Sequence, residues 1–501
     1  MKRRTSSRHL RLSASALALC GVLTLAACGS GSDSDDHDSA PPPAETPVTQ
    51  SEFDLHMEAS RLNTGADPRM VDPWRAFYCN LSDDNNAIVL AQRQRNSVRV
   101  PMTRIFDDVW YIGTEYVGQY ILKNDDGFVL IDGGNSAEEM RDYDIPALTE
   151  LGWGPDAPLH GVLLTHGHRD HDGGALEIKN ASGAPVYLGS ADAEGKDYDP
   201  VKLDSSKLEP YDIEIGGRTI TVLSTPGHTP GATGFVVRAK DGDKEVKLFV
   251  SGGSSLQKDN IPLIRDYLRS MERTYDLIKT MKIDTASNPH IYWDGSRDLI
   301  YQIREEGLKS PSQFIIGNEK LLRAMAIGRE CTAAWLAHQE PTTKESVWRV
   351  STTQFLAGSP SPNRISARIS NGWGPVAGQT VKFSTESGEE VCSGVTDDSG
   401  VASCPTPTPS LAAGSDRLVA SFEGAESPDV VDLGSHDDAL FEDLTVSACR
   451  DLGRAQATTG ARLGDTNYSA RLDMDGDGVI GQEDLQRITN LLPAGTQCSA
   501  S

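Results

Sequence analysis

The sequence predicts an α/β domain, followed by a small all-β sandwich and a short C-terminal module. Residues 53–343 alternate between predicted strands and helices, which is the order of an α/β domain. Residues 348–440 hold short strands between Gly, Asn, Asp and Ser turns, which favours a β-sandwich. Residues 446–501 contain one Asp-rich loop followed by helical spacing. A length of 501 residues agrees with about three domains, at one per ~150 residues.

Within the α/β domain the strands are short apolar runs rich in Val, Ile, Leu and aromatic residues. The helices are longer stretches with helical spacing of their apolar residues. The predicted strands are 109–112, 128–131, 162–164 and 248–250, and the predicted helices include 137–151 and 263–282. Two further helical stretches, 70–78 and 321–337, flank this core.

The N-terminal residues 1–27 are expected to be a secretory leader rather than part of the fold. Basic residues crowd its start and an apolar run follows from about residue 12 to residue 27, as in a signal peptide. The run ends in Leu-Ala-Ala-Cys, which resembles a bacterial lipobox in which Cys28 is lipidated. Residues 28–52, rich in Gly, Ser, Asp and Pro, are expected to be a disordered tether. The alternative is plain cleavage nearby, with Cys28 as a bystander.

The predicted location is the envelope of a bacterium, either the periplasm or the outer membrane and cell surface. No later stretch reaches the ~20 apolar residues of a spanning helix, so the membrane contact is expected through the lipid on Cys28. The formal net charge of −25 would repel phosphates, so a nucleic acid partner is not expected.

Six cysteines remain after the leader and the lipid site, an even number that suggests disulfides in an exported protein. Sequence alone does not fix their connectivity, but successive pairs fall into successive modules. Cys79 and Cys331 could join the two ends of the α/β domain, or remain buried free thiols. The other four are Cys392 and Cys404, which flank a turn, and Cys449 and Cys498, which bracket the C-terminal module.

One segment concentrates metal-ligand side chains, Thr165-His-Gly-His-Arg-Asp-His-Asp-Gly-Gly174, directly after the apolar run 161–164. The carboxyl end of a strand is where α/β sheets place their sites. Four ligand-type residues within six positions cannot easily reach one ion, but they can serve two adjacent ions. Nitrogen and carboxylate ligands are those that zinc takes in proteins.

This segment resembles the His-x-His-x-Asp-His signature of the metallo-β-lactamase superfamily. The rest of that pattern follows in order: Asp132 after the strand 129–131, His228 within Thr-Pro-Gly-His-Thr-Pro-Gly, and His290 after Ser-Asn-Pro. The resemblance covers roughly residues 105–295. It implies an αββα sandwich, in which two sheets lie face to face, helices lie outside and two zinc ions lie at one sheet edge.

The resemblance also assigns ligands and roles. His166, His168 and His228 would hold the first zinc, and Asp170, His171 and His290 would hold the second. A zinc-bound hydroxide would then attack the carbonyl of a small-molecule substrate, with Asp170 in the catalytic set. Asp132 would fix ligand orientation through hydrogen bonds. The alternative for Asp132 is a turn former beside two glycines.

The strand 248–250 narrows the choice within the superfamily. Thioesterases and lactonases of this superfamily usually place a metal-bridging Asp after this strand, whereas here it runs into Ser-Gly-Gly-Ser-Ser. The chain therefore resembles the third subclass of metallo-β-lactamases, which cleave a cyclic amide. Ser254 or Ser255 could bind the water or the substrate carboxylate, with Ser255 as the expected catalytic choice, and the alternative is that both are turn serines. The alternatives are a lactonase or thioesterase, or a surface binding protein that uses the fold as a scaffold.

The two C-terminal modules carry weaker resemblances. Residues 374–381 and 396–402 resemble bacterial immunoglobulin-like domains. The loop 473–484 resembles an EF-hand or dockerin repeat, with Ca²⁺ ligands at Asp473, Asp475, Asp477, Val479 and Asp484 and a sharp turn at Gly478. An acidic turn without metal is the alternative. These modules suggest a cell-surface partner, and the single loop, where dockerins usually have two, argues against a dockerin-type partner.

Overall fold

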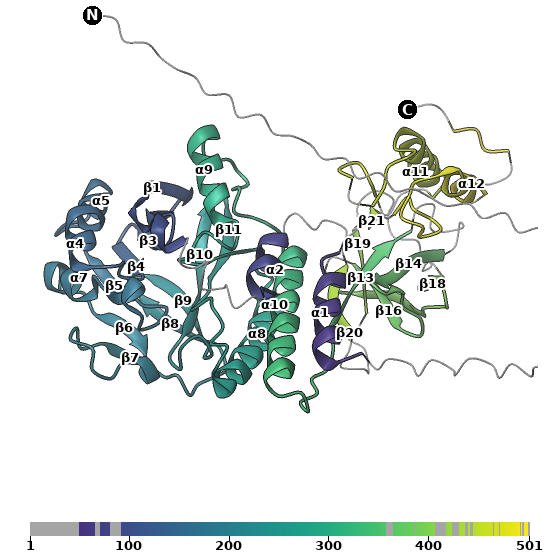
Figure 1. Cartoon of the computed structure of the whole chain (residues 1–501). Helices are drawn as coiled ribbons and strands as arrows, with labels where there is room; N and C mark the ends of the chain where they lie inside the picture. Colours follow the sequence, from purple (N-terminus) through teal and green to yellow (C-terminus); the bar gives the residue numbers. More distant parts are fainter. Residues whose placement is uncertain are drawn as a thin grey trace, which may run out of the picture. The chain divides into compact units, whose positions relative to one another are not determined.

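The computed structural model (Figure 1) describes residues 50–65, 71–80, 92–356, 364–385, 387–405, 417–422, 430–435, 439–440, 444–463, 465–469, 471–490, 492 and 495–498. The predicted leader, Cys28 and nearly all of the tether lie outside these residues. Helix α1 (Glu52–Leu62) begins where the tether was expected to end. Its N-cap is Ser51, whose hydroxyl oxygen accepts a hydrogen bond from the backbone N–H of Asp54.

The first sheet has seven strands in sequence order from β1 to β7. The pairs from β1 to β4 are antiparallel, and those from β4 to β7 are parallel. The strands are β1 (Arg99–Phe106), β2 (Val109–Thr114), β3 (Gly118–Asn124), β4 (Gly127–Ile131), β5 (Leu159–Leu163), β6 (Val186–Gly189) and β7 (Val201–Leu203).

The second sheet has five strands in the order β12-β11-β10-β9-β8. Only the β11–β12 pair is parallel. The strands are β8 (Tyr211–Ile215), β9 (Arg218–Ser224), β10 (Thr233–Asp241), β11 (Lys244–Val250) and β12 (Thr285–Ser287).

The two sheets bury one core between them, and helices cover their outer faces (Figure 1). Tyr111 and Ile131 of the first sheet pack with Val222 and Phe235 of the second. On the outside of the first sheet lie α4 (Ala137–Glu139), α5 (Ile145–Glu150) and α7 (Ala175–Ser182). Outside the second sheet lie α8 (Ile261–Met281), α10 (Asn318–Gln339) and α2 (Asp72–Tyr78). This is the expected αββα layering.

One predicted helix is interrupted. Residues 137–151 were expected to form one helix, but a π-helical turn, η3 (Met140–Asp144), separates α4 from α5. Pro146 lies in the first turn of α5, and a proline has no N–H to continue the preceding helical ladder. The remaining helical segments of this part are η2 (Arg95–Ser97), α6 (Arg169–Asp172), η4 (Ser190–Asp192) and α9 (Ser296–Glu306).

Two further sheets follow the α/β part and share a core that includes Phe355, Phe383 and Phe422. One has the order β15-β14-β13-β20 with β18 paired to β14, and the other β17-β16-β19-β21. Their strands are β13 (Arg349–Phe355), β14 (Arg364–Asn371), β15 (Gly374–Pro375), β16 (Thr380–Thr385), β17 (Glu390–Val395), β18 (Val401–Pro405), β19 (Arg417–Phe422), β20 (Val430–Ser435) and β21 (Ala439–Leu440).

The C-terminal part contains α11 (Leu444–Ala457) and α12 (Gln482–Asn490) around a small apolar core. The structure joins the cysteines in the three expected pairs, with Cα–Cα distances of 4.9 Å for Cys79–Cys331, 6.1 Å for Cys392–Cys404 and 5.3 Å for Cys449–Cys498. Among the described residues, none of the helices combines the length and apolar character needed to span a bilayer.

Candidate metal centre

The His-rich loop leaves the carboxyl end of β5 and turns at once into α6. His166 follows the strand, and His168 is the residue before α6 and has an extended backbone. A Cβ atom at Gly173 or at Gly174 would collide with the backbone of the neighbouring loop, at Asn135 or Gly133. The two glycines therefore let this loop and the loop after β4 pack against each other, which fixes the position of the intervening ligand-type residues.

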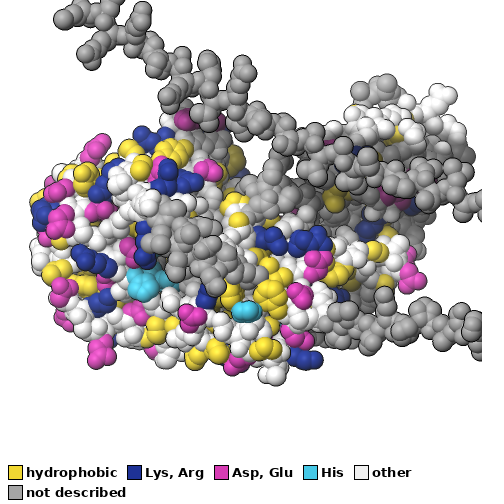
Figure 2. Space-filling view, viewed as in Figure 1, with side chains coloured by type: hydrophobic (Ala, Val, Ile, Leu, Met, Phe, Trp, Pro, Cys, Tyr) yellow, Lys and Arg dark blue, Asp and Glu magenta, His cyan; other side chains and the backbone are white. Residues whose placement is uncertain are grey.

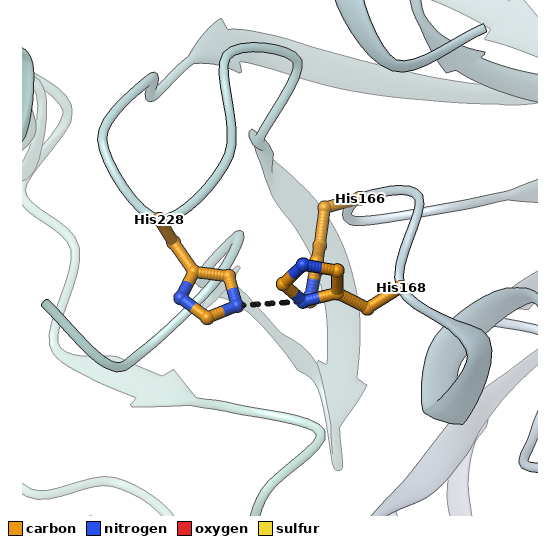
Figure 3. Close-up of side chains that lie close together, drawn as sticks. All are labelled: His166, His168 and His228. Atoms are coloured by element: carbon orange, nitrogen blue, oxygen red, sulfur yellow. Dashed lines mark hydrogen bonds between the residues drawn. The ribbon is translucent and has the colours of Figure 1, made fainter. Parts of the chain in front are cut away.

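Three histidines form a first group. Nδ1 of His168 lies 3.1 Å from Nε2 of His166 and 3.0 Å from Nε2 of His228, and Figure 3 shows the three rings converging. Nitrogen ligands of a tetrahedral zinc ion would be about 3.3 Å apart, given bonds of about 2.0–2.1 Å. His168 is exposed, so the group opens to solvent, and histidine side chains reach the surface in Figure 2. The donor set fits a divalent cation such as zinc.

A second group lies beside the first. Nε2 of His290 is 3.1 Å from Nε2 of His171 and 3.5 Å from Oδ2 of Asp170. All three ligand atoms lie within 4.8 Å of one another. The rings of His166 and His171 are 4.0 Å apart between centroids, which places the two groups next to each other. The structure thus brings together all six residues that the sequence predicted as ligands.

Two of these histidines, His228 and His290, have their outer ring nitrogens on backbone carbonyls. Nδ1 of His228 donates to the carbonyl oxygen of Ser255 at 2.6 Å, and Nδ1 of His290 donates to that of Tyr116 at 3.0 Å. A carbonyl can only accept, so each of these Nδ1 atoms carries the proton and each Nε2 presents a lone pair. Lone pairs that face one another across a small space are the arrangement a cation requires.

Burial keeps most of these imidazoles neutral. It lowers the pKa of His166 well below its usual value, with the neighbouring imidazoles adding to the effect. Burial likewise lowers the pKa of His228 to about 4 and that of His290 to about 3. A neutral imidazole is the form that binds a metal ion, so the protein holds these side chains ready at neutral pH.

His171 differs because Asp132 lies against it. Burial acts to lower the pKa of His171, but the charge and hydrogen bond of Asp132 outweigh burial and raise it. Oδ1 of Asp132 also accepts from the backbone N–H of Thr165 at 2.7 Å. Asp132 therefore contacts both β5's following loop and a ligand-type histidine, rather than only forming a turn.

Asp192 is a residue that the motif did not reveal. Its carboxylate accepts hydrogen bonds from the N–H of Gly167 at 2.9 Å, the N–H of Gly231 at 2.8 Å and the hydroxyl of Thr229 at 2.6 Å. One side chain thereby ties the loop of His166 and His168 to the loop of His228. Its only sequence signal is its place after β6, a third strand that ends at the same sheet edge.

The second-sheet loops position the remaining candidates. Nδ1 of His228 lies 2.6 Å from the carbonyl oxygen of Ser255 and 3.2 Å from its hydroxyl. Both contacts of Ser255 are therefore to one ligand-type histidine. Ser254 is buried and its carbonyl accepts from Tyr267. Tyr116 was not predicted, yet its ring centroid is 4.6 Å from that of His290 and its hydroxyl accepts from Arg93 at 3.3 Å.

The Asp-rich loop gathers three of its five predicted ligands. Asp473, Asp475 and Asp484 have carboxylate oxygens within 4.8 Å of one another. Asp477 lies outside this group of three, and its carboxylate accepts from the N–H of Val479 at 2.7 Å, just as that of Asp475 accepts from the N–H of Asp477 at 3.2 Å. Gly478 has a φ of +82°, as the expected sharp turn requires.

Comparisons with known proteins agree with this arrangement. The model of the metallo-β-lactamase superfamily matches residues 113–243. A hydroxyacylglutathione hydrolase of Klebsiella pneumoniae is 31% identical over 113 residues, which cover 22% of this chain and 39% of that protein. A probable metallo-hydrolase of Bacillus subtilis is 28% identical over 144 residues, which cover 26% and 64%. The chain thus spans less than two thirds of the length of these relatives.

Solved structures show a partial likeness. A metallo-β-lactamase of Cronobacter sakazakii is 26% identical, with a TM-score of 0.40 and coverage of 50% of this chain and 98% of that one. A subclass B3 metallo-β-lactamase of Bradyrhizobium japonicum is 24% identical, with a TM-score of 0.37 and coverage of 47% and 93%.

The structure thus combines an αββα sandwich with two adjacent groups of metal-ligand side chains at one sheet edge. The chain contains a metallo-β-lactamase superfamily domain, by the match over residues 113–243.

Proposed function

We propose that the chain is a zinc-dependent hydrolase that opens a cyclic amide of the β-lactam type. The observation that carries the substrate choice is the residue after β11. Ser251 stands there, and its hydroxyl oxygen accepts from Nδ2 of Asn288 at 2.7 Å. A metal-bridging carboxylate at this point is typical of the thioesterases and lactonases of the superfamily. Its replacement by a neutral hydroxyl supports the β-lactamase type.

The proposed ligands are the two groups described above. His166, His168 and His228 would hold one zinc ion, and Asp170, His171 and His290 would hold the other. When bound, zinc lowers the pKa of a water molecule and polarises a carbonyl oxygen.

The protein's own residues would prepare this chemistry by orientation. Asp132 fixes the ring of His171, and the carbonyls of Ser255 and Tyr116 fix the rings of His228 and His290. Asp170 is the one carboxylate in the six, and its pKa is lowered: burial acts to raise it, but His171 and His290 outweigh burial. Asp170 would therefore be ionised at neutral pH.

Hydrolysis of a thioester is the second candidate, because two hydroxyacylglutathione hydrolases are 31% and 32% identical to this chain over 113 and 102 residues. The contacts of Ser255 favour neither of the two reactions, because its hydroxyl and its carbonyl both lie beside His228.

We also propose an exported, lipid-anchored protein with Ca²⁺ bound by the loop 473–484. The three disulfides support export, since disulfides persist in oxidising compartments. The cluster of Asp473, Asp475 and Asp484 supports Ca²⁺, whose preferred ligands are oxygens.

The test is turnover of a cephalosporin, a carbapenem and a thioester by the zinc-loaded mature chain. We expect chelator-sensitive cleavage of a β-lactam and little thioester cleavage. His168→Ala should abolish turnover, whereas His160→Ala should not, because His160 lies outside both groups and contacts the carbonyl of Asp126. Efficient thioester turnover without β-lactam cleavage would reject the substrate choice.

A further inference from the structure

Arg368 joins the β-sandwich to the C-terminal module. It lies in β14 between Ala367 and Ile369, whose side chains are buried in the core of the sandwich. Because successive side chains of a strand point to opposite faces, the side chain of Arg368 lies on the outer face of its sheet. Its guanidinium donates to two adjacent backbone carbonyls, that of Asp473 at 3.1 Å and that of Met474 at 2.9 Å.

These two carbonyls belong to the first two residues of the loop 473–484, the proposed Ca²⁺ loop. The backbone N–H of Met474 donates to Oδ1 of Asp484, the last residue of the loop, at 2.5 Å. This N–H and the carbonyl of Asp473 belong to one peptide unit, and in a trans peptide the two point in opposite directions. Closing the loop with Asp484 therefore turns the carbonyl of Asp473 outward, toward Arg368.

The loop also approaches Arg368 closely at Gly476. A Cβ atom there would lie 3.2 Å from Nη1 of Arg368, which is tighter than most side-chain contacts. Gly476 has a φ of +76°, and its N–H donates to Oδ1 of Asp473 at 2.7 Å. Glycine at this position thus serves both the turn of the loop and the approach of the guanidinium.

Charge repulsion opposes closure of the loop when no cation is bound. The carboxylates of Asp473, Asp475 and Asp484 have oxygens within 4.8 Å of one another. Burial raises the pKa of Asp475, and the charges of Asp484 and Asp477 raise it further. Like charges at this spacing repel, whereas a divalent cation among them attracts all of them. A bound cation therefore favours the closed loop, and with it the outward carbonyl.

From this geometry we propose that the loop 473–484 is a Ca²⁺-dependent clamp, which docks the C-terminal module onto the outer face of β14 through Arg368. The inference rests on the proposed Ca²⁺ site and adds a role for it: the closed loop presents two carbonyls to one guanidinium. Two events that share one conformation strengthen each other. Docking must therefore raise the affinity for Ca²⁺ by the same factor by which Ca²⁺ favours docking.

Calorimetric titration of the mature chain with CaCl₂ tests this coupling. Arg368→Gln removes the docking contact and should weaken Ca²⁺ binding about 5-fold or more. A guanidinium that acted only as a nearby positive charge would have the opposite effect, because its removal would strengthen the binding of a cation. The sign of the change therefore separates the two roles.

Arg487→Gln is the matched control. Arg487 also donates to the carbonyl of Met474, at 3.3 Å, but it belongs to α12 of the same module, so its loss removes a charge without undocking the module. We expect its affinity for Ca²⁺ to equal or exceed that of the wild type. Arg368→Lys keeps the positive charge on the sheet and loses the fixed two-pronged donor, so it should weaken Ca²⁺ binding even if Arg368→Gln destabilises the sandwich.

A distance measurement tests the docking itself. Spin labels at two exposed positions, Ala377 before β16 and Gln486 in α12, report the separation of the sandwich and the module. Non-natural amino acids that carry the labels leave the disulfides intact. With Ca²⁺ the wild type should give one narrow distance distribution, which broadens after chelation and also broadens in Arg368→Lys with Ca²⁺ present.

The results separate the clamp from the Ca²⁺ site. Ca²⁺ binding that is unchanged or tighter in both Arg368 variants, or a distance distribution equally narrow without Ca²⁺, would overturn the clamp and leave the site standing. A wild-type chain that takes up no Ca²⁺ would reject the proposed site and the clamp with it.

Discussion

Oδ2 of Asp132 lies 2.6 Å from Nδ1 of His171, and both side chains are buried. The backbone of Asp132 has a φ of +67°, a left-handed conformation that Asp and Asn tolerate better than most residues. The local backbone and the hydrogen bond therefore favour the same small polar side chain. Because this contact fixes the ring of His171, Asp132 should act on the second group through His171.

Asp132→Asn keeps the backbone preference and removes the charge, so it tests this role without straining the turn. We expect affinity for the ion of the second group to fall about 10–100-fold, the usual effect of losing such an orienting partner. Affinity at the first group should stay close to that of the wild type. Titration against a coloured chelator measures both. Asp199→Asn is the control, since Asp199 is exposed and also has a positive φ; equal affinities in both variants would argue against the role.

Asp192→Ala should destabilise the protein, because three donors from two loops lose one shared acceptor. Hydrogen bonds to a charged group contribute about 1.5–3 kcal/mol each, so we expect a loss of about 2–4 kcal/mol in unfolding free energy after relaxation. The first group should also bind metal more weakly. Urea denaturation measures the stability, with the exposed Asp197→Ala as control. A denaturation curve unchanged by Asp192→Ala would contradict the linking role.

The stability of the fold should fall with rising pH because of Asp144. Burial raises the pKa of this carboxyl to about 7, and its Oδ1 has no hydrogen-bond partner among the described residues. A carboxyl whose pKa is raised on folding lowers the stability of the fold when it ionises. This loss is absent below the unfolded pKa of about 3.9 and is complete once the pH has risen through the folded pKa of about 7.

Asp144→Asn removes this titration. At about 1.4 kcal/mol per pKa unit, the variant should be more stable than the wild type by up to about 4 kcal/mol at pH 8. At pH 4 the two proteins should be nearly equal. Urea denaturation at both pH values measures the difference, and a gain that is the same at pH 4 and pH 8 would rule out titration of Asp144 as its cause.

Ca²⁺ should protect the loop 473–484 from hydrogen exchange, because a ligand that binds only the folded state stabilises it. The comparison uses the full mature chain with and without millimolar Ca²⁺, read in the peptides that span α12. Asp473→Ala should lose the protection, and Asp398→Ala, an exposed residue elsewhere, should keep it. Identical exchange with and without Ca²⁺ would leave the loop as an acidic turn.

The ligand residues could be predicted because their signal is local. His166, His168, Asp170 and His171 fall in one short loop after one apolar strand, and His228 lies in a similar loop. The αββα layering followed from the resemblance that these residues carry. The break in the predicted helix 137–151 also had a local signal, Pro146, which the apolar spacing outweighed.

The remaining features depend on tertiary contacts that no local pattern records. Asp192 is 25 positions or more from each residue whose donor it accepts, and Tyr116 meets His290 across 174 positions. The disulfide between Cys79 and Cys331 joins α2 to α10 across 252 positions. Asp477 and Val479 lie outside the group of three carboxylates that the structure gathers in this loop, so their role as calcium ligands stays a prediction.

The central claim is that two adjacent groups of three ligands each hold one metal ion. The zinc content of the purified mature chain tests this claim most directly. Elemental analysis after zinc loading should find about two ions per chain in the wild type. His228→Ala and His290→Ala each remove a ligand from a different group, so each should retain about one ion. A wild-type chain that stays metal-free after loading, or two variants that retain the full wild-type content, would contradict the claim.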